Sequence, residues 1–279
     1  QGFSELKAIF ILGLFSACSA FLFYRQNFFC LKKTSDLTIN RRMVLLVVSI
    51  YFLIATFFPF LIYNLLLFSF KEVSSPLLLM TIAQFGSALS LVFFLIAFSL
   101  IQSKKTNAAI WIGEQKPSWN FFRKNISMGV LTWLLCFPLA LFFGSLSQFL
   151  CTLFWGILPQ EQLAVKFLRL ISTSKSFTLF TLFSILIVAP VIEEWVFRGY
   201  LQTYLKKKFK FPYALFLSST IFTLCHLSLS QGLSNISLLV SLFVLALFLG
   251  FLYEKQGNLI SSVTLHITFN SISVIRILF

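Results

Sequence analysis

The sequence predicts an all-α protein: a polytopic bundle of about eight transmembrane helices with one interfacial amphipathic helix. Of its 279 residues, 58% are hydrophobic and only 11% are charged, whereas about a quarter of the residues in a soluble domain are charged. The apolar residues gather in runs of about 20, the length of a helix that crosses a hydrocarbon core of about 30 Å. Helices are expected because a backbone in lipid must satisfy its own hydrogen bonds.

Eight apolar runs are the candidate spans, and no second soluble domain is expected. In chain order, the predicted spans are 8–24, 43–68, 77–101, 126–155, 177–190, 213–229, 236–253 and 259–279. The first four are generic, although the second contains Pro59 and the fourth contains Pro138. The fifth is short and leads into a less apolar helix that extends through Lys206.

The segment 159–170 is predicted to be a helix that lies at the membrane interface. Its apolar residues, such as Leu163 and Phe167, alternate with polar ones, such as Glu161 and Lys166. This pattern is typical of helices that lie in the plane of the membrane surface. We group the segment with the first helices as region 1–176 and the remaining helices as region 177–279, within a single membrane domain.

The net charge of +14 is interpreted as a topology signal rather than as a nucleic-acid-binding surface, because the basic residues occupy short loops between apolar runs. With eight spans, 15 of the 22 Lys and Arg residues fall on one side and six on the other, with Arg198 set aside. Cytoplasmic loops are enriched in Lys and Arg, so both termini are expected outside. The Phe-rich, multi-pass chain fits a bacterial inner membrane, with the lipid bilayer around it.

The rare ionisable residues indicate a functional site. Six of the eight acidic residues lie in loops or at span ends, but Glu193 and Glu194 directly follow an apolar run, and both histidines, His226 and His266, lie inside apolar runs. A charged side chain in a membrane helix costs about 2.5–3.5 kcal/mol on insertion scales unless it is paired or hydrated. We therefore expect these groups to meet at one interior site that water can reach.

Helical spacing predicts how the polar residues face one another. Glu194 and Arg198 are four residues apart, in the order that favours an ion pair, and Glu193 points about 100° away from that pair. Two further pairs share a helix face, namely Phe222 with His226 and His266 with Asn270. The structural alternative is that these residues only form hydrogen bonds between transmembrane helices.

These residue types suffice for the hydrolysis of a carbonyl compound. A carboxylate and an imidazole together can take a proton from water and return it to a leaving amine, and a second imidazole with a side-chain amide can stabilise an oxyanion. Two histidines and a glutamate can also hold zinc, and spacing does not decide between the two mechanisms. The sequence contains neither a His-Glu-x-x-His motif nor a Gly-x-Ser-x-Gly motif.

Three short motifs fall one to a helix in region 177–279. They are Glu193-Glu194-Trp195-Val196-Phe197-Arg198-Gly199, Phe222-x-x-x-His226 and His266-x-x-x-Asn270. In order and placement they resemble the motifs of the CPBP family, also called Abi, which comprises intramembrane CAAX proteases and bacteriocin-processing or bacteriocin-immunity proteins. The resemblance implies that this region is the catalytic core of an intramembrane glutamic endopeptidase.

The resemblance also implies roles, a partner and a cofactor requirement. By this resemblance, Glu193 with His226 would activate water, and His266 with Asn270 would stabilise the oxyanion. Glu194 and Arg198 would match the remaining catalytic motif positions. Phe222 would form a wall of the substrate site. The partner would be a peptide or protein substrate in the membrane. No cofactor is expected, because the eukaryotic CAAX enzymes resemble metal-free glutamate proteases. The alternative is zinc held by Glu193, His226 and His266.

Two other function classes remain open. The first is a non-catalytic scaffold or bacteriocin-immunity protein, since the resemblance also covers family members that act without cleaving peptides. The second is a proton-coupled transporter, in which the Glu and His residues form a proton relay. Transporters often have helices broken at matching places in both halves, and Pro59 and Pro138 have no evident counterparts in the C-terminal half.

Overall fold

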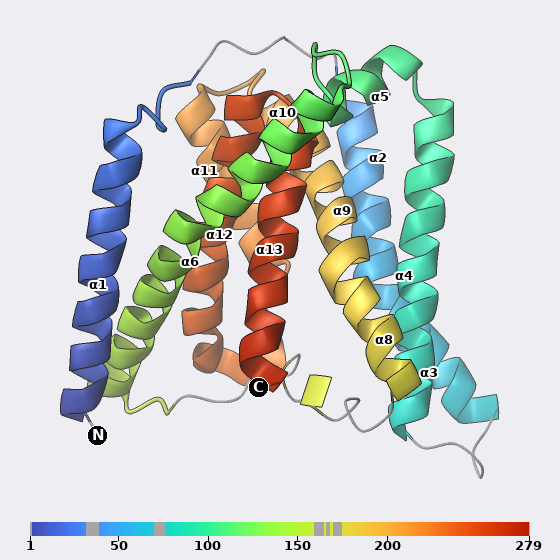
Figure 1. Ribbon diagram of the computed structural model, residues 1–279. Helices are drawn as coiled ribbons and strands as arrows, with labels where there is room; N and C mark the ends of the chain where they lie inside the picture. The colour runs from blue at the N-terminus through green and yellow to red at the C-terminus, as the bar shows by residue number, and fades with distance from the viewer. Residues whose placement is uncertain are drawn as a thin grey trace.

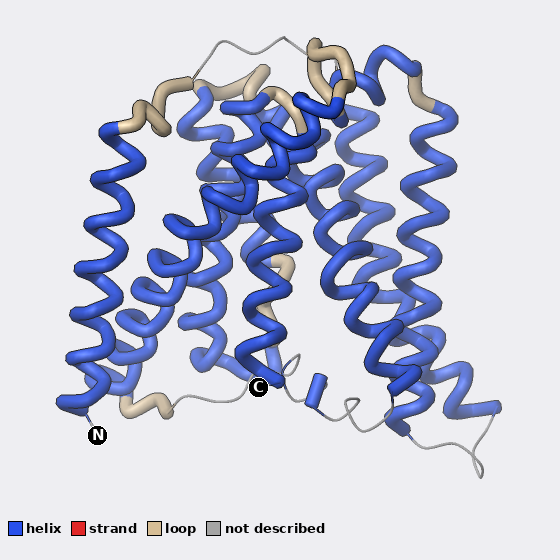
Figure 2. The backbone as a smooth tube through the Cα atoms, in the orientation of Figure 1, coloured by secondary structure: helices blue, strands red, loops and turns tan. Residues whose placement is uncertain are grey.

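The fold is a bundle of helices, which confirms the predicted fold class (Figures 1 and 2). The computed structural model describes residues 2–31, 39–69, 76–158, 165, 168–169 and 175–278. These residues contain no strand, and seven of their helical stretches are long and apolar enough to cross a membrane. The protein is therefore a multi-pass integral membrane protein.

The N-terminal part supplies the first four of these long stretches. Its helices are α1 (Gly2–Arg25), α2 (Arg41–Phe52), the π-helical segment η1 (Leu53–Phe57), α3 (Phe58–Ser69), α4 (Pro76–Ile101), α5 (Lys104–Trp111) and α6 (Trp119–Trp155). The short α5 was not predicted, and it begins where the Ser103 hydroxyl accepts a hydrogen bond from the Thr106 backbone N–H. Ser118 caps α6 in the same way through Phe121, so the fourth span begins at Trp119 rather than at 126.

The C-terminal part supplies the other three long stretches and one shorter apolar helix. Its elements are α8 (Lys175–Phe183), the π-helical η2 (Ser184–Val188), α9 (Ala189–Glu194), the π-helical η3 (Trp195–Gln202), α10 (Thr203–Leu205), α11 (Phe211–Leu224), the 3₁₀ segment η4 (Leu229–Asn235), α12 (Ile236–Gln256) and α13 (Leu259–Leu278). The fifth predicted span and the less apolar helix after it form one continuous stretch, Thr178–Leu205.

The sixth span was predicted too long. α11 ends at Leu224, and its 14 residues extend about 21 Å at 1.5 Å per residue, less than a hydrocarbon core of about 30 Å. The chain then continues irregularly toward η4, midway along the bundle in Figure 2. The Asn235 side chain donates to the carbonyls of Ser228 and Gly232 in this stretch, as a non-helical backbone at membrane depth requires.

The predicted interfacial helix, 159–170, lies outside the described residues except for 165 and 168–169, and it stays a prediction. Leu168, one of its apolar residues, is 2% exposed and belongs to a small apolar cluster with Val274 of α13. At this residue the segment contacts the bundle.

The N- and C-terminal ends of the chain lie at the same end of the bundle, and α5 and α10 lie at the opposite end (Figure 1). This placement agrees with the even number of crossings that the sequence predicts. Near the end that carries α10, Lys207 Nζ donates to the Ile39 carbonyl at 2.8 Å and Lys255 Nζ to the Cys30 carbonyl at 3.0 Å. The cytoplasmic assignment of this basic end stays a prediction.

α6 crosses α12 and α13 at close range through glycine. Gly129 lies against Ser261 of α13, and Gly144 lies against Ser237 of α12, whose hydroxyl donates to the Gly144 carbonyl at 2.9 Å. Small residues let membrane helices approach closely where lipid supplies no hydrophobic driving force between them. α6 thus supports the two helices that carry the last two spans.

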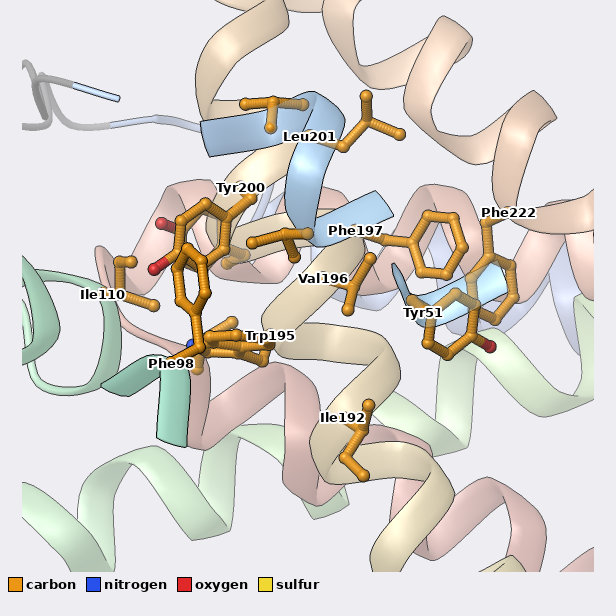
Figure 3. Packing of buried hydrophobic residues seen from close by; sticks show 14 of the residues in the cluster. Tyr51, Phe98, Ile110, Ile192, Trp195, Val196, Phe197, Tyr200, Leu201 and Phe222 are labelled. Carbon is orange, nitrogen blue, oxygen red and sulfur yellow. The ribbon is translucent and has the colours of Figure 1, made fainter. Parts of the chain in front are cut away.

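An aromatic core surrounds η3 and attaches the N-terminal helices to it (Figure 3). Trp195, Phe197 and Tyr200 are fully buried. The Phe98 ring of α4 lies 5.7 Å from the Trp195 ring, and the Tyr51 ring of α2 lies 5.5 Å from the Phe197 ring, between centroids and edge to face in both cases. The segment that follows the two membrane-embedded glutamates is therefore held by α2 and α4.

The second span contains the π-helical η1 directly before Pro59. In this register the Phe58 N–H bonds to the Leu53 carbonyl, so the Ile54 carbonyl would pair with residue 59, where proline has no N–H. The Ser87 hydroxyl of α4 donates to the Ile54 carbonyl instead, at 2.7 Å. A hydrogen bond from a neighbouring helix thus replaces the missing one.

Candidate active site

Glu194 and Arg198 form the ion pair that their spacing predicts. Arg198 Nη1 lies 3.0 Å from Glu194 Oε1, and both side chains are almost fully buried. Arg198 Nη2 donates to the Ala246 carbonyl of α12 at 3.1 Å, and the guanidinium lies over the Phe222 ring, 4.5 Å from its centroid. The pair therefore joins η3 to α11 and α12.

His266 of α13 lies between the two adjacent glutamates. Its Nδ1 is 3.0 Å from Glu194 Oε1, and its Nε2 is 3.8 Å from Glu193 Oε2. An ionised carboxylate only accepts hydrogen bonds, so the forms of His266 that carry a proton on Nδ1 are the ones that donate to Glu194. One imidazole ring thus links the buried, Arg-paired carboxylate to its neighbour.

Glu193 is the more accessible of the two carboxylates. Its side chain is 12% exposed, whereas that of Glu194 is fully buried. The Tyr51 hydroxyl of α2 donates to Glu193 Oε1 at 3.4 Å. Sequence reasoning missed Tyr51, because it is separated from Glu193 by 142 residues and lies in an apolar run with no distinguishing pattern.

His226 follows the end of α11 and packs on Phe222. The two ring centroids are 4.8 Å apart, and His226 Nδ1 lies 2.9 Å from the Phe222 carbonyl. The Phe222 ring also contacts His266, with centroids 6.0 Å apart. Within the described residues no hydrogen bond or ion pair joins His226 to Glu193, so the two predicted water-activating residues are not in direct contact.

Asn270 lies one turn after His266 on α13, but its contact is with the backbone of η2. Its side-chain amide donates to the Ile185 carbonyl at 3.1 Å. The Ala189 N–H bonds to the Ser184 carbonyl, so in this π register Ile185 would pair with residue 190, which is a proline. The geometry seen at Pro59 therefore recurs at Pro190 in the C-terminal half. The sequence alone showed no evident counterpart of Pro59 there.

The zinc alternative requires Glu193, His226 and His266 to converge on one point. Among the described residues, no three His, Cys, Asp or Glu side chains are gathered as a metal ion would need. His266 Nδ1 is already directed at Glu194. The arrangement of these three side chains does not fit a zinc site.

The contacts connect six of the seven predicted site residues into one cluster, and Asn270 stands beside it. Its members come from η3 and α9, from the end of α11 and from α13, the three places where the motifs occur. A partly accessible carboxylate, a second carboxylate neutralised by arginine and two imidazoles can together accept, hold and return protons. Such a set is suited to acid–base chemistry inside a membrane protein.

The comparison with known families agrees with this geometry. Residues 175–272 match the family described as type II CAAX prenyl endopeptidase Rce1-like, and the match contains all three motifs. No curated protein and no solved structure matches the chain. The resemblance to CAAX proteases that the motifs predict is thereby confirmed. Residues 175–272 are therefore similar to the CAAX proteases, a family of membrane peptidases.

Proposed function

We propose that the protein is an intramembrane peptidase that hydrolyses a peptide bond of a membrane-associated or lipidated protein or peptide. The observation that supports this best is the position of His266 between Glu194 and Glu193, at 3.0 and 3.8 Å. This cluster lies inside the residues that match a protease family. The family indicates the reaction class, and the cluster contains the proton-transfer groups that the reaction requires.

Glu193 is the proposed general base, because it is the less buried carboxylate. It takes a proton from a water molecule whose oxygen attacks the scissile carbonyl carbon. The proton passes to the leaving amine when the C–N bond breaks. His226 is the proposed second proton carrier: its Nδ1 faces the Phe222 carbonyl, which acts only as an acceptor, so Nε2 is the basic nitrogen of the neutral ring.

His266 and Asn270 are the proposed oxyanion donors. One N–H of the Asn270 amide bonds to the Ile185 carbonyl, which fixes the plane of the amide and leaves the second N–H to donate. His266 requires a proton on Nε2 for this role, since its Nδ1 faces Glu194. Each oxyanion donor typically contributes about 10²–10³ in rate.

The proposed substrate has a lipidated C-terminal segment, because the matching family is described as CAAX prenyl endopeptidase. A farnesylated, internally quenched peptide that ends in a CAAX sequence is therefore the first probe, and the same peptide without the farnesyl group tests the need for a lipid. The proposed location is the bacterial inner membrane.

The test is peptide cleavage by the purified protein in detergent, followed by fluorescence and mass spectrometry. Glu193→Ala and His226→Ala are expected to abolish cleavage while their melting temperatures stay near that of the wild type. Glu114→Ala is the matched control, because Glu114 is exposed in a loop remote in sequence from the motifs. Undiminished turnover in Glu193→Ala or His226→Ala would overturn the proposed water-activating pair. A folded wild type that cleaves neither peptide would favour a non-catalytic role.

Metal dependence is tested in the same assay. We expect cleavage to persist after incubation with 1,10-phenanthroline and after dialysis against a chelator, because the described donors do not gather around one point. Activity lost to the chelator and restored by zinc would establish the metal-dependent mechanism instead.

A further inference from the structure

Tyr51 is the contact that the N-terminal helices make with the proposed base. Its hydroxyl donates to Glu193 Oε1, while Glu193 Oε2 faces His266 Nε2. The two oxygens of the carboxylate therefore have different partners from different helices. At 3.4 Å the Tyr51 hydrogen bond is long, as hydrogen bonds in ligand-free active sites often are.

The packing of α2 fixes the position of the Tyr51 ring. Tyr51 is 6% exposed, its ring meets Phe197 edge to face, and the Phe197 ring in turn meets Phe222 (Figure 3). Val47, one turn earlier on the same face of α2, is fully buried in the same core. A buried ring with this packing holds its hydroxyl in one place, so the hydrogen bond requires little additional ordering of the side chain.

Tyr51 lies outside residues 175–272, which match the protease family. Nothing in the three motifs therefore specifies it. We propose that Tyr51 is a positioning residue for Glu193: it holds Oε1 and stabilises the ionised carboxylate, so that Oε2 stays directed at the space in front of His266. This role rests on the proposed function of Glu193 as a base.

The kinetic test compares Tyr51→Phe with Tyr253→Phe on the farnesylated peptide. Phenylalanine keeps the ring packing in both variants. Tyr253 is a matched control, because it is also a buried tyrosine whose hydroxyl has a side-chain partner, Thr203 at 3.1 Å. We expect Tyr51→Phe to lower kcat about ten-fold or more with KM unchanged, as the loss of a hydrogen bond to a charged group predicts. Tyr253→Phe is expected to keep the wild-type kcat.

A second test needs no substrate. Dicyclohexylcarbodiimide is an apolar reagent that adds to protonated carboxyl groups in membrane proteins, and the modified Glu193 peptide is quantified by mass spectrometry across a pH series. Tyr51→Phe is expected to be labelled up to a higher pH than the wild type, because the variant lacks a hydrogen bond that favours the ionised form. The other titratable or charged groups that interact with Glu193 or lie next to it are unchanged in this variant: Glu194, Arg198, Cys225 and His266.

The outcomes separate the two proposals. A labelling profile of Tyr51→Phe that coincides with those of the wild type and Tyr253→Phe would overturn the role of Tyr51, as would an unchanged kcat. A shifted profile in a protein that cleaves neither peptide would support the role of Tyr51 while the proposed peptidase function fails. Glu193→Gln shows which labelled peptide belongs to this residue.

Discussion

The side-chain amide of Asn270 donates a hydrogen bond to the backbone carbonyl of Ile185 over 3.1 Å. Pro190 leaves this carbonyl without a partner in the π register of η2, and the last helix of the chain supplies the donor. Asn270 thus has a structural contact that is independent of any catalytic role. Ser87 donates to the Ile54 carbonyl before Pro59 in the same way. In both helices, a side chain from another helix thus supplies the hydrogen bond that the proline cannot donate.

The first prediction concerns the hydrogen bond from Asn270 to the Ile185 carbonyl. Asn270→Ala leaves the half-buried Ile185 carbonyl without a donor and is expected to lower the free energy of unfolding by about 1–3 kcal/mol. Pro190→Ala restores a backbone N–H at the position that the π register pairs with Ile185, so the double variant is expected to recover part of the loss. Urea or thermal unfolding in detergent micelles measures the coupling. The cycle of Ser87→Ala with Pro59→Ala is the parallel case, and strictly additive effects in both cycles would contradict this account.

The second prediction concerns the buried ion pair. Arg198→Ala leaves Glu194 charged, buried and without its arginine, and is expected to destabilise the protein by about 3–5 kcal/mol. Arg198→Lys is expected to recover little of this, because one ammonium group does not reproduce the two-sided contact of the guanidinium with Glu194 and Ala246. The measurement is the melting temperature in detergent.

Lys206→Ala is the control for this prediction. Lys206 pairs with Glu254 at 2.6 Å, but its side chain is 21% exposed, whereas that of Arg198 is 1% exposed. Water screens the more exposed pair, so a smaller loss of stability is expected. Equal losses in Arg198→Ala and Lys206→Ala would contradict the burial argument.

The third prediction concerns the crossing of α6 and α13. A Cβ at Gly129 would lie 2.7 Å from the Ser261 carbonyl oxygen and 2.7 Å from Thr264 Cβ. Gly129→Ala is therefore expected to separate the helices and to cost about 1–3 kcal/mol. Gly86→Ala is the milder control, because its Cβ would meet only the flexible end of Ile62. Size-exclusion profiles and melting temperatures measure both, and a Gly129→Ala variant as stable as Gly86→Ala would refute the close approach.

Local spacing predicted the parts of the fold and the site that lie on single helices. The Glu194–Arg198 pair follows from the four-residue spacing, and the apolar runs place seven of the eight spans. The short α11 was not predictable, because the apolar run 213–229 continues past the point where the helix ends. The Tyr51 contact depends on how α2 packs against η3. The contact of His266 with Glu194 depends on how α13 packs against the helix that bears Glu194. Neither packing has a signature in the one-dimensional pattern.

The hydrogen bond from Asn270 to the Ile185 carbonyl of η2 has a consequence for biogenesis. Proteins are synthesised from the N-terminus, so the helix that bears Glu193 leaves the ribosome before α13. In the π register of the assembled helix, the Ile185 carbonyl depends on Asn270 for its partner, and an unsatisfied backbone group in hydrocarbon costs several kcal/mol. Docking of α13 brings Asn270 to this carbonyl and His266 to the glutamates together. A nascent chain in which α13 has not yet docked therefore lacks the contacts of Asn270 with Ile185 and of His266 with the two glutamates.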